Sequence, residues 1–215
     1  MTTKPERIEP EILGSDALDL LSQRLQNYRP RRLPGRQWVA RCGVILLIAE
    51  HGPDDGTDAP ALLMMRRAER SGDPWSGHVS FPGGRVDPGD ASARAAALHE
   101  LEEETGITSA HGLTPIGRLS DLITREHGRR RPMVVSPYVY RTPRALALEP
   151  SAEAAKLWWE PLSHLVDPTR RQAMVWRVAG LPIPVSSILV SDARLWGLSL
   201  MMTNELIRAT KLKVP

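Results

Sequence analysis

The hydrophobic residues of this 215-residue chain gather in short runs that predict β-strands. The longest run, residues 44–49 (VILLIA), is apolar without alternation, a pattern typical of a strand that is buried on both faces. Further runs rich in branched and aromatic residues are bounded by glycine, proline and aspartate. The predicted strand segments are 38–50, 61–67, 77–81, 113–123, 133–141, 173–180 and 181–190.

Helical periodicity is confined to fewer segments. Apolar residues recur at intervals of three and four in residues 91–105 and 195–207, and a shorter helix is expected at either 151–157 or 160–166. Leucines at helical spacing also predict a short helix over residues 16–28, before the basic stretch RPRRLPGR. Strands mixed with a few helices favour an α+β fold, an α/β/α sandwich in which a mixed sheet packs between helices.

The same patterns indicate how the chain is divided. We interpret residues 1–36 as an N-terminal helical extension and linker, and residues 37–215 as one domain with a single core. Residues 52–60 (GPDDGTDAP) are expected to form a hairpin loop between the first two strands.

Composition and charge narrow the class of protein. A formal charge of +3 and a pI of about 9.3 suit anionic small molecules but lack the dense basic field of a nucleic-acid-binding protein, so no nucleic-acid partner is expected. No apolar run approaches the roughly 20 residues needed to span a membrane, and the N-terminus lacks the apolar core of a signal peptide. Cys42, the only cysteine, is expected to be a core residue, and nothing indicates an oxidising compartment. We therefore expect a cytoplasmic protein without a membrane partner.

Candidate chemistry begins at residues 99–106, HELEEETG, which place four glutamates within five positions. At 100° per residue, Glu100, Glu103 and Glu104 fall within an arc of about 100°. The small and apolar residues of the same helix cluster on the opposite side: Ala91, Ala95, Leu98 and Leu101. One face of the helix is therefore expected to pack while the other presents carboxylates.

The predicted helix has recognisable ends, with Asp90 as the expected N-cap and Gly106 just beyond the C-terminus. The glutamates thus occupy the last two turns, where the helix dipole disfavours negative charge and their spacing adds repulsion. A divalent cation such as Mg²⁺ or Mn²⁺ would remove both penalties, because hard cations prefer carboxylate oxygens. A solvated acidic face neutralised by lysines and arginines is the alternative that the helix alone leaves open.

The wider stretch of residues 80–107 resembles the Nudix box, the loop-and-helix motif of Nudix hydrolases. The matching positions are Gly84, Asp90, Glu100, Leu101, Glu103, Glu104, Gly106 and Ile107. This sequence has His99 in place of the motif's arginine, Asp90 in place of its usual glutamate, and one extra residue between them. Since the family arginine holds a metal-binding glutamate in place, His99 is expected to do so only weakly or only when protonated.

Upstream, the chain resembles in part the signature of the coenzyme A branch of this family. The fitting residues are Leu62, Leu63, Gly77, Phe81, Pro82, Gly83 and Gly84. Arg66 is followed by Arg67 instead of serine, the spacing is longer, and Trp75 stands in the place of a histidine.

Two downstream segments extend the similarity. Residues 155–168 resemble the family's Trp-x-Pro-Leu segment, and residues 193–206 resemble the Arg-apolar-Trp-Gly-apolar helix start of coenzyme A Nudix domains. Read without the family, Trp158, Trp159 and Trp196 are expected to be core or interface aromatics.

The resemblance implies a Nudix-fold hydrolase that cleaves a diphosphate linkage with Mg²⁺ or Mn²⁺ as cofactor. Glu100, Glu103 and Glu104 are implied as the metal ligands and catalytic residues, and either Glu103 or Glu104 could orient the attacking water, with Glu153 as a remote alternative. The preferred substrate is coenzyme A or acyl-coenzyme A, giving a phosphopantetheine product and adenosine 3′,5′-bisphosphate. ADP-ribose, a nucleotide sugar, or a catalytically inactive Nudix-fold binding or regulatory protein are the alternatives, and a homodimer is left open.

Substrate binding is assigned to two glycines and three arginines. Gly83 and Gly84 would permit a tight turn whose amides touch the diphosphate. The expected arginines are Arg66, Arg125 and Arg129, the last two in the loop TREHGRRRP, because guanidinium forks match phosphate oxygens. Solvated charge is the alternative for this loop, and His78 and Asp121 are expected to have structural or hydrogen-bonding roles.

Overall fold

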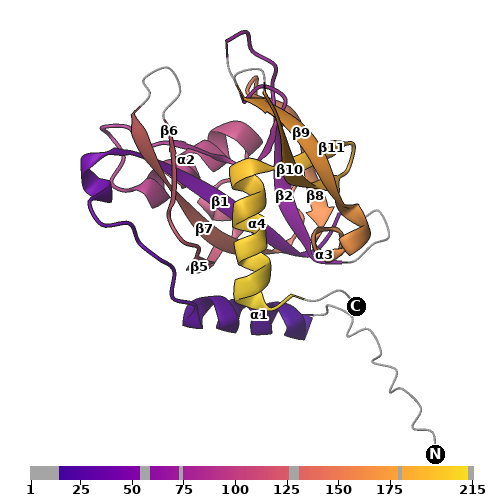
Figure 1. The fold of residues 1–215 in the computed structure, drawn as a ribbon. Helices are drawn as coiled ribbons and strands as arrows, with labels where there is room; N and C mark the ends of the chain where they lie inside the picture. Colours follow the sequence, from indigo (N-terminus) through magenta and orange to yellow (C-terminus); the bar gives the residue numbers. More distant parts are fainter. Residues whose placement is uncertain (1–14, 54–58, 73–74, 126–130, 179–180, 213–215) are drawn as a thin grey trace, which may run out of the picture.

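The computed structural model describes residues 15–53, 59–72, 75–125, 131–178 and 181–212. Its helices are α1 (Ser15–Asn27), α2 (Ala93–Thr105), α3 (Leu162–Val166) and α4 (Gly197–Thr210), with short 3-10 turns at Arg36–Trp38, Ser109–His111 and Pro168–Arg170. Its strands are β1 (Ala40–His51), β2 (Ala61–Arg67), β3 (Val79–Ser80), β4 (Gly83–Arg85), β5 (Thr114–Arg118), β6 (Leu122–Arg125), β7 (Pro132–Arg144), β8 (Ala154–Pro161), β9 (Arg171–Val178), β10 (Leu181–Val190) and β11 (Ala193–Trp196). Figure 1 shows their arrangement.

The strands form one large mixed sheet and one small antiparallel sheet. The large sheet has the order β3-β2-β1-β7-β5, with β4 paired to β1, β6 to β7 and β8 to β2. Its central pair, β1 and β7, is parallel, and the other pairs are antiparallel. The small sheet has the order β11-β10-β9. In Figure 1, α4 crosses the near side of the large sheet and α2 lies behind it.

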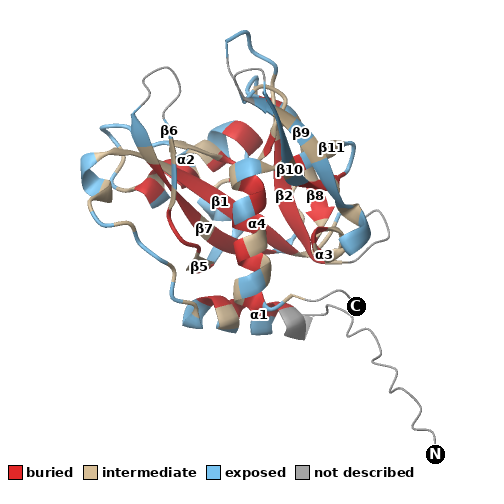
Figure 2. Cartoon of the chain, viewed as in Figure 1, coloured by how far each residue is buried: buried red, intermediate tan, exposed pale blue. Residues whose placement is uncertain are grey.

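Strand β1 is buried on both faces, which explains its unbroken apolar sequence. Val44, Leu46 and Ile48 belong to the core cluster that includes residues of α1 and α4, whereas Ile45 and Leu47 belong to the cluster that includes residues of α2. Figure 2 shows the central strands as the most buried part of the molecule. A mixed sheet packed between helices confirms the predicted α+β class.

Most predicted strands are present, but the segments before and after β7 differ in part from the prediction. Residues 113–123 divide into β5 and the start of β6, and residues 154–161 form β8 where a helix at 151–157 was one of two alternatives. The other alternative is correct, because α3 occupies 162–166. β8 pairs with β2 along most of its length, so tertiary pairing decided its conformation.

The helix predicted before the first strand is present as α1, and it packs on the rest of the molecule. Leu18, Leu21 and Leu25 are buried in the larger core cluster. Tyr28 Oη donates a hydrogen bond of 2.7 Å to Glu205 on α4. The division of the chain at residue 36 stays a prediction.

Two further expectations concern loops and membranes. Strands β1 and β2 pair antiparallel, as the predicted hairpin requires, although residues 54–58 of its loop lie outside the described residues. Within the described segments, no helix has the length and apolarity needed to cross a bilayer.

Candidate functional site

The acidic helix α2 begins two residues later than its periodicity indicated. Ser92 is the N-cap, and its side chain accepts a hydrogen bond from the backbone N–H of Ala95 at 3.1 Å. The prediction of Asp90 as N-cap is therefore wrong; its carboxylate instead accepts from the N–H of Asp87 in the preceding turn, at 2.8 Å. Gly106 ends the helix as predicted, with φ of 74° and its N–H donating to the Glu102 carbonyl.

The buried face of α2 also differs from the predicted one. It includes Ala93, Ala97, Leu101 and Glu104, while Ala91 is exposed and precedes the helix. Glu104 follows Leu101 by three positions, so it turns toward the same side and is only 2% exposed. The three glutamates are thus not equivalent, because Glu104 is buried, Glu100 is half-buried and Glu103 is exposed.

Glu104 is held against the loop that enters β4. Its Oε2 accepts a hydrogen bond of 3.0 Å from the backbone N–H of Gly83. Burial raises the pKa of Glu104 to about 8, and the charge of Glu100 adds to the rise. Burial and the charge of Glu103 likewise raise the pKa of Glu100. Two carboxylates that disfavour their own ionisation therefore lie together beside the glycine turn.

Three glycines allow this close approach of β1, β4 and α2. A Cβ at Gly84 would lie 1.9 Å from Glu100 Oε1, and one at Gly83 would lie 2.4 Å from the carbonyl oxygen of Gly43. A Cβ at Gly43 itself would lie 1.7 Å from the carbonyl oxygen of Ala93. The motif pointed to Gly83 and Gly84, whereas Gly43 lies in an apolar strand where no sequence signal marks it.

Glu103 has a separate environment on the outer side of α2. His99 Nε2 lies 3.2 Å from Glu103 Oε1, close enough to orient the carboxylate of this glutamate. Within the described residues, no three His, Cys, Asp or Glu side chains are grouped closely enough to hold a metal ion as they stand. The carboxylate donors nevertheless fit a hard divalent cation, whose charge would offset the burial and the repulsion that raise the pKa of Glu100 and Glu104.

A cavity of about 470 Å³ lies beside the turn at Gly83 that contacts Glu104, and Gly83 forms part of its wall. Its floor is largely apolar and includes Val44, Met133 and Met202. Cys42 also lines it, and burial, reinforced by the charges of Glu100 and Glu104, raises the pKa of its thiol to about 12. The thiol therefore stays protonated near neutral pH, which argues against a nucleophilic role.

The arginines of the site are only partly those that the sequence singled out. Arg125 lines the cavity, and so do Arg67 and Arg85. Arg66 instead forms an ion pair with Asp192 at 3.3 Å. The pairing of β2 with β8 shifts register between Arg66 and Arg67. Such an irregularity reorients the side chains that follow it, so simple alternation could not reveal Arg67 as the cavity residue. Arg129 lies outside the described residues.

Glu153, the remote alternative for orienting the attacking water, has an arginine partner. Glu153 is exposed, pairs with Arg70 at 3.1 Å, and contributes to the raised pKa of both Glu100 and Glu104. Its charge therefore acts on the cluster although it belongs to the loop before β8.

Asp121 has the hydrogen-bonding surroundings expected of a structural residue. It is buried, accepts from Ser136 Oγ at 2.7 Å and from the N–H of Leu33 at 2.9 Å, and pairs with Arg36 and Arg118. Burial alone would raise the pKa of Asp121, yet these hydrogen bonds and the charge of Arg118 lower it below its usual value. Asp121 thus ties the segment before β1 to β7.

The aromatic residues divide into two groups. Trp159 is buried and donates to the Leu146 carbonyl at 3.0 Å, and Trp158 donates to Glu160 at 2.7 Å, so both have structural roles. Trp196, by contrast, lines the cavity. The expectation of a core or interface role for it is incomplete, because the residues that meet there come from distant segments.

Comparison with known proteins gives three findings. A model of the NUDIX domain matches residues 40–176. An uncharacterized protein of Schizosaccharomyces pombe is 31% identical over 170 residues, which cover 70% of this chain and 50% of that protein. An uncharacterized Nudix hydrolase, NudL, of Photorhabdus laumondii is 37% identical over 123 residues, which cover 52% of this chain and 61% of that protein. The chain therefore spans between half and two thirds of the length of these relatives.

Solved structures agree on the fold. A MutT/nudix family protein from Enterococcus faecalis superimposes with a TM-score of 0.51 at 17% identity, covering 89% of this chain and 67% of that one. Because the domain model matches well over half of the residues, including the glycine turn and the acidic helix, the chain belongs to the NUDIX domain family.

Proposed function

We propose that this protein is a metal-dependent hydrolase of the diphosphate linkage in a nucleoside diphosphate derivative, with coenzyme A or acyl-coenzyme A as the preferred substrate. One observation carries the proposal: Glu100 and Glu104 press against the Gly83–Gly84 turn at the wall of the cavity. A buried and a half-buried carboxylate placed together in this way oppose their own ionisation, so a purely structural role gives no reason for the arrangement.

Glu100, Glu103 and Glu104 would hold Mg²⁺ or Mn²⁺. When bound, the ion would offset charge that develops on the phosphoryl oxygens and lower the pKa of a bound water. The chain's own residues orient these ligands, since the N–H of Gly83 fixes Glu104 and His99 contacts Glu103.

The cavity supports an anionic substrate. Three arginines line it, Arg67, Arg85 and Arg125, and among its described lining residues there is no carboxylate. Guanidinium groups bind phosphate oxygens in bidentate geometry, so these side chains would contact the diphosphate. Arg66 and Arg129 remain proposed substrate-binding residues. The partial coenzyme A signature in residues 62–84 favours coenzyme A over ADP-ribose or a nucleotide sugar.

The test is hydrolysis of coenzyme A, acetyl-coenzyme A, ADP-ribose, NADH and nucleotide sugars with Mg²⁺, with Mn²⁺ and with EDTA. Wild type would be compared with Glu103→Gln and with Glu102→Gln, a matched control because Glu102 is an exposed glutamate of the same helix outside the motif. We expect Glu103→Gln to lower kcat/KM on the order of a hundredfold or more and Glu102→Gln to leave it nearly unchanged.

The outcomes separate the alternatives. Cleavage of another diphosphate with the same dependence on Glu103 would keep the site and replace the substrate. Ligand binding without any turnover, unaffected by Glu103→Gln, would contradict the enzyme and favour a binding or regulatory protein.

A further inference from the structure

Four aromatic rings from three separate parts of the chain meet beside the cavity, and three of them line it. His78 lies at their centre, with ring centroids 5.8 Å from Trp75, 5.6 Å from Trp176 and 4.8 Å from Trp196. Trp176 and Trp196 also contact each other, at 4.4 Å and a tilt of 45°. We call these four residues the aromatic cluster.

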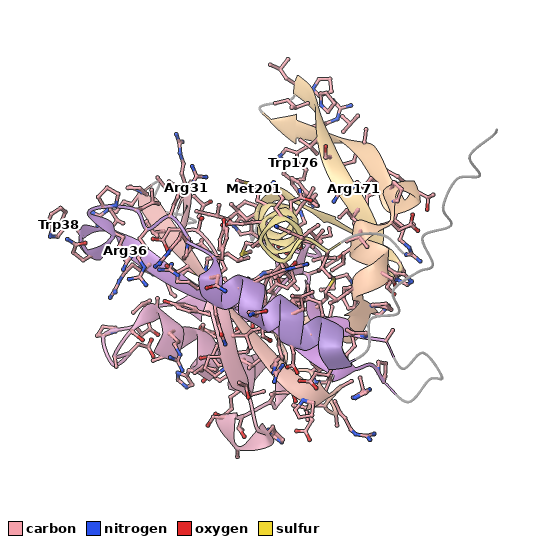
Figure 3. All side chains as sticks on the ribbon, turned by 90° about the horizontal axis from the view of Figure 1, so that it is seen from below. Arg31, Arg36, Trp38, Arg171, Trp176 and Met201 are labelled. Atoms are coloured by element: carbon pink, nitrogen blue, oxygen red, sulfur yellow. The ribbon has the colours of Figure 1, made fainter. Side chains whose placement is uncertain are left out.

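The aromatic cluster joins the two sheets. Trp75 and His78 precede β3 at the edge of the large sheet, whereas Trp176 lies on β9 and Trp196 ends β11 in the small sheet. Trp75, His78 and Trp196 line the cavity, and Trp176 packs on Trp196 without lining it. Figure 3 shows Trp176 on the small sheet, next to the end-on view of α4. The small sheet therefore supplies one wall of the cavity, and Trp176 supports that wall.

A core role does not account for these rings. Trp75 is 41% exposed, and His78, Trp176 and Trp196 are only half-buried. Indole rings that line a cavity and stay partly accessible offer flat π-faces, which suit a planar ligand group. An aliphatic chain needs no such faces, and the valines and methionines of the cavity floor already suit one.

We propose that the aromatic cluster binds the planar base of the substrate by stacking, with Trp196 as the main platform and Trp75 as the facing wall. Trp176 and His78 act as positioning residues that hold Trp196. The arginines of the same cavity place negative phosphate groups next to a stacked base, so the ligand class is a nucleotide. This inference rests on the proposed function in one respect, that the substrate contains a nucleoside half.

Binding in EDTA tests the inference without turnover. ADP would be titrated into wild type, Trp196→Leu, Trp196→Phe and Trp75→Leu, and followed by calorimetry and by quenching of tryptophan fluorescence. We expect Trp196→Leu to weaken ADP binding about tenfold, and Trp196→Phe, which keeps a ring, to weaken it less. Trp38→Leu is the matched control, because Trp38 is 82% exposed and projects from another end of the molecule in Figure 3. Trp38→Leu should bind ADP as wild type does.

A second titration uses pantetheine, the part of coenzyme A that has no nucleobase, with the same proteins. If Trp196→Leu weakens pantetheine binding and spares ADP, the aromatic cluster binds the other half of the substrate and the inference is overturned. Equal ADP binding by wild type, Trp196→Leu and Trp75→Leu overturns it as well, whatever the hydrolysis assay finds. ADP binding that depends on Trp196 in a protein that hydrolyses no diphosphate would keep the inference and contradict the proposed function.

Discussion

Glu104 combines burial with a hydrogen bond from a backbone N–H, and this combination affects stability as well as chemistry. Its pKa of about 8 in the folded protein lies above the ordinary value of 4.5. The folded state therefore binds a proton more tightly than the unfolded state. The contribution of Glu104 to the free energy of unfolding is therefore fully present below pH 4.5 and is lost as pH rises through about 8.

Replacement of Glu104 by Gln should expose this effect. In EDTA, we expect Glu104→Gln to be increasingly more stable than wild type as pH rises from 5 toward 8, with a difference in slope of at most about 1.4 kcal/mol per pH unit. Urea unfolding of both proteins at pH 5.5 and pH 8.5 measures it, and Glu102→Gln should follow wild type. A constant difference across this range would contradict the burial of an ionisable Glu104. The same variant should lose any stabilisation by Mg²⁺.

Some residues of the candidate site could be predicted from the sequence, and others could not. Glu100, Glu103 and Glu104 could be identified from their spacing and their motif, because both are local properties. The burial of Glu104 could not, since it depends on where the helix packs. The aromatic cluster could not be identified either, because more than a hundred residues separate His78 from Trp196.

Among the elements, β1, β4 and α2 depend on glycines in two different ways. At Gly43 an added methyl group would meet the backbone of Ala93, and a helix backbone can yield only by leaving the sheet. At Gly84 it would meet the side chain of Glu100, which can rotate.

Alanine at Gly43 should therefore mainly lower stability, whereas alanine at Gly84 should mainly lower activity. We expect Gly43→Ala to lower the free energy of unfolding by about 3 kcal/mol or more, because overpacking against backbone cannot relax locally. Gly84→Ala should change it by about 1 kcal/mol or less and still reduce activity, because Glu100 is displaced. Denaturant unfolding with hydrolysis of the best substrate measures both. Equal loss of stability in the two variants would show that Glu100 cannot move aside.

Element prediction succeeded where one local signal dominated. The run Val44–Ala49 predicts β1 because it is apolar throughout, and Gly106 predicts the end of α2. β8 was not predicted as a strand, because its conformation depends on pairing with β2. The register shift between Arg66 and Arg67 is likewise a property of that pairing, so the position of Arg67 at the cavity could not be predicted from the sequence.

At the scale of the whole molecule, α1 is part of the main core. Leu21 is 2% exposed in a cluster that also contains residues of α4 and of the large sheet. We expect Leu21→Ala to lower the free energy of unfolding by about 3 kcal/mol, because it leaves a cavity among these elements. Leu20→Ala is the control, since Leu20 is 42% exposed on the same helix. Unfolding in urea measures both, and similar small effects would mean that α1 contributes little to the core.

The parallel pairing of β1 with β7 has a consequence for how the protein is made. β1 leaves the ribosome well before its long parallel partner β7, because β2 to β6 and α2 are synthesised between the two strands. Until then, Val44–Ala49 has one of its flanks uncovered, and pairing across so long a stretch of chain is slow. β11 and α4, which follow β7 along the chain, then complete the cavity. The acidic helix is thus translated well before the wall that would receive a substrate, so a nascent chain acquires its site only after β11 and α4 have been made.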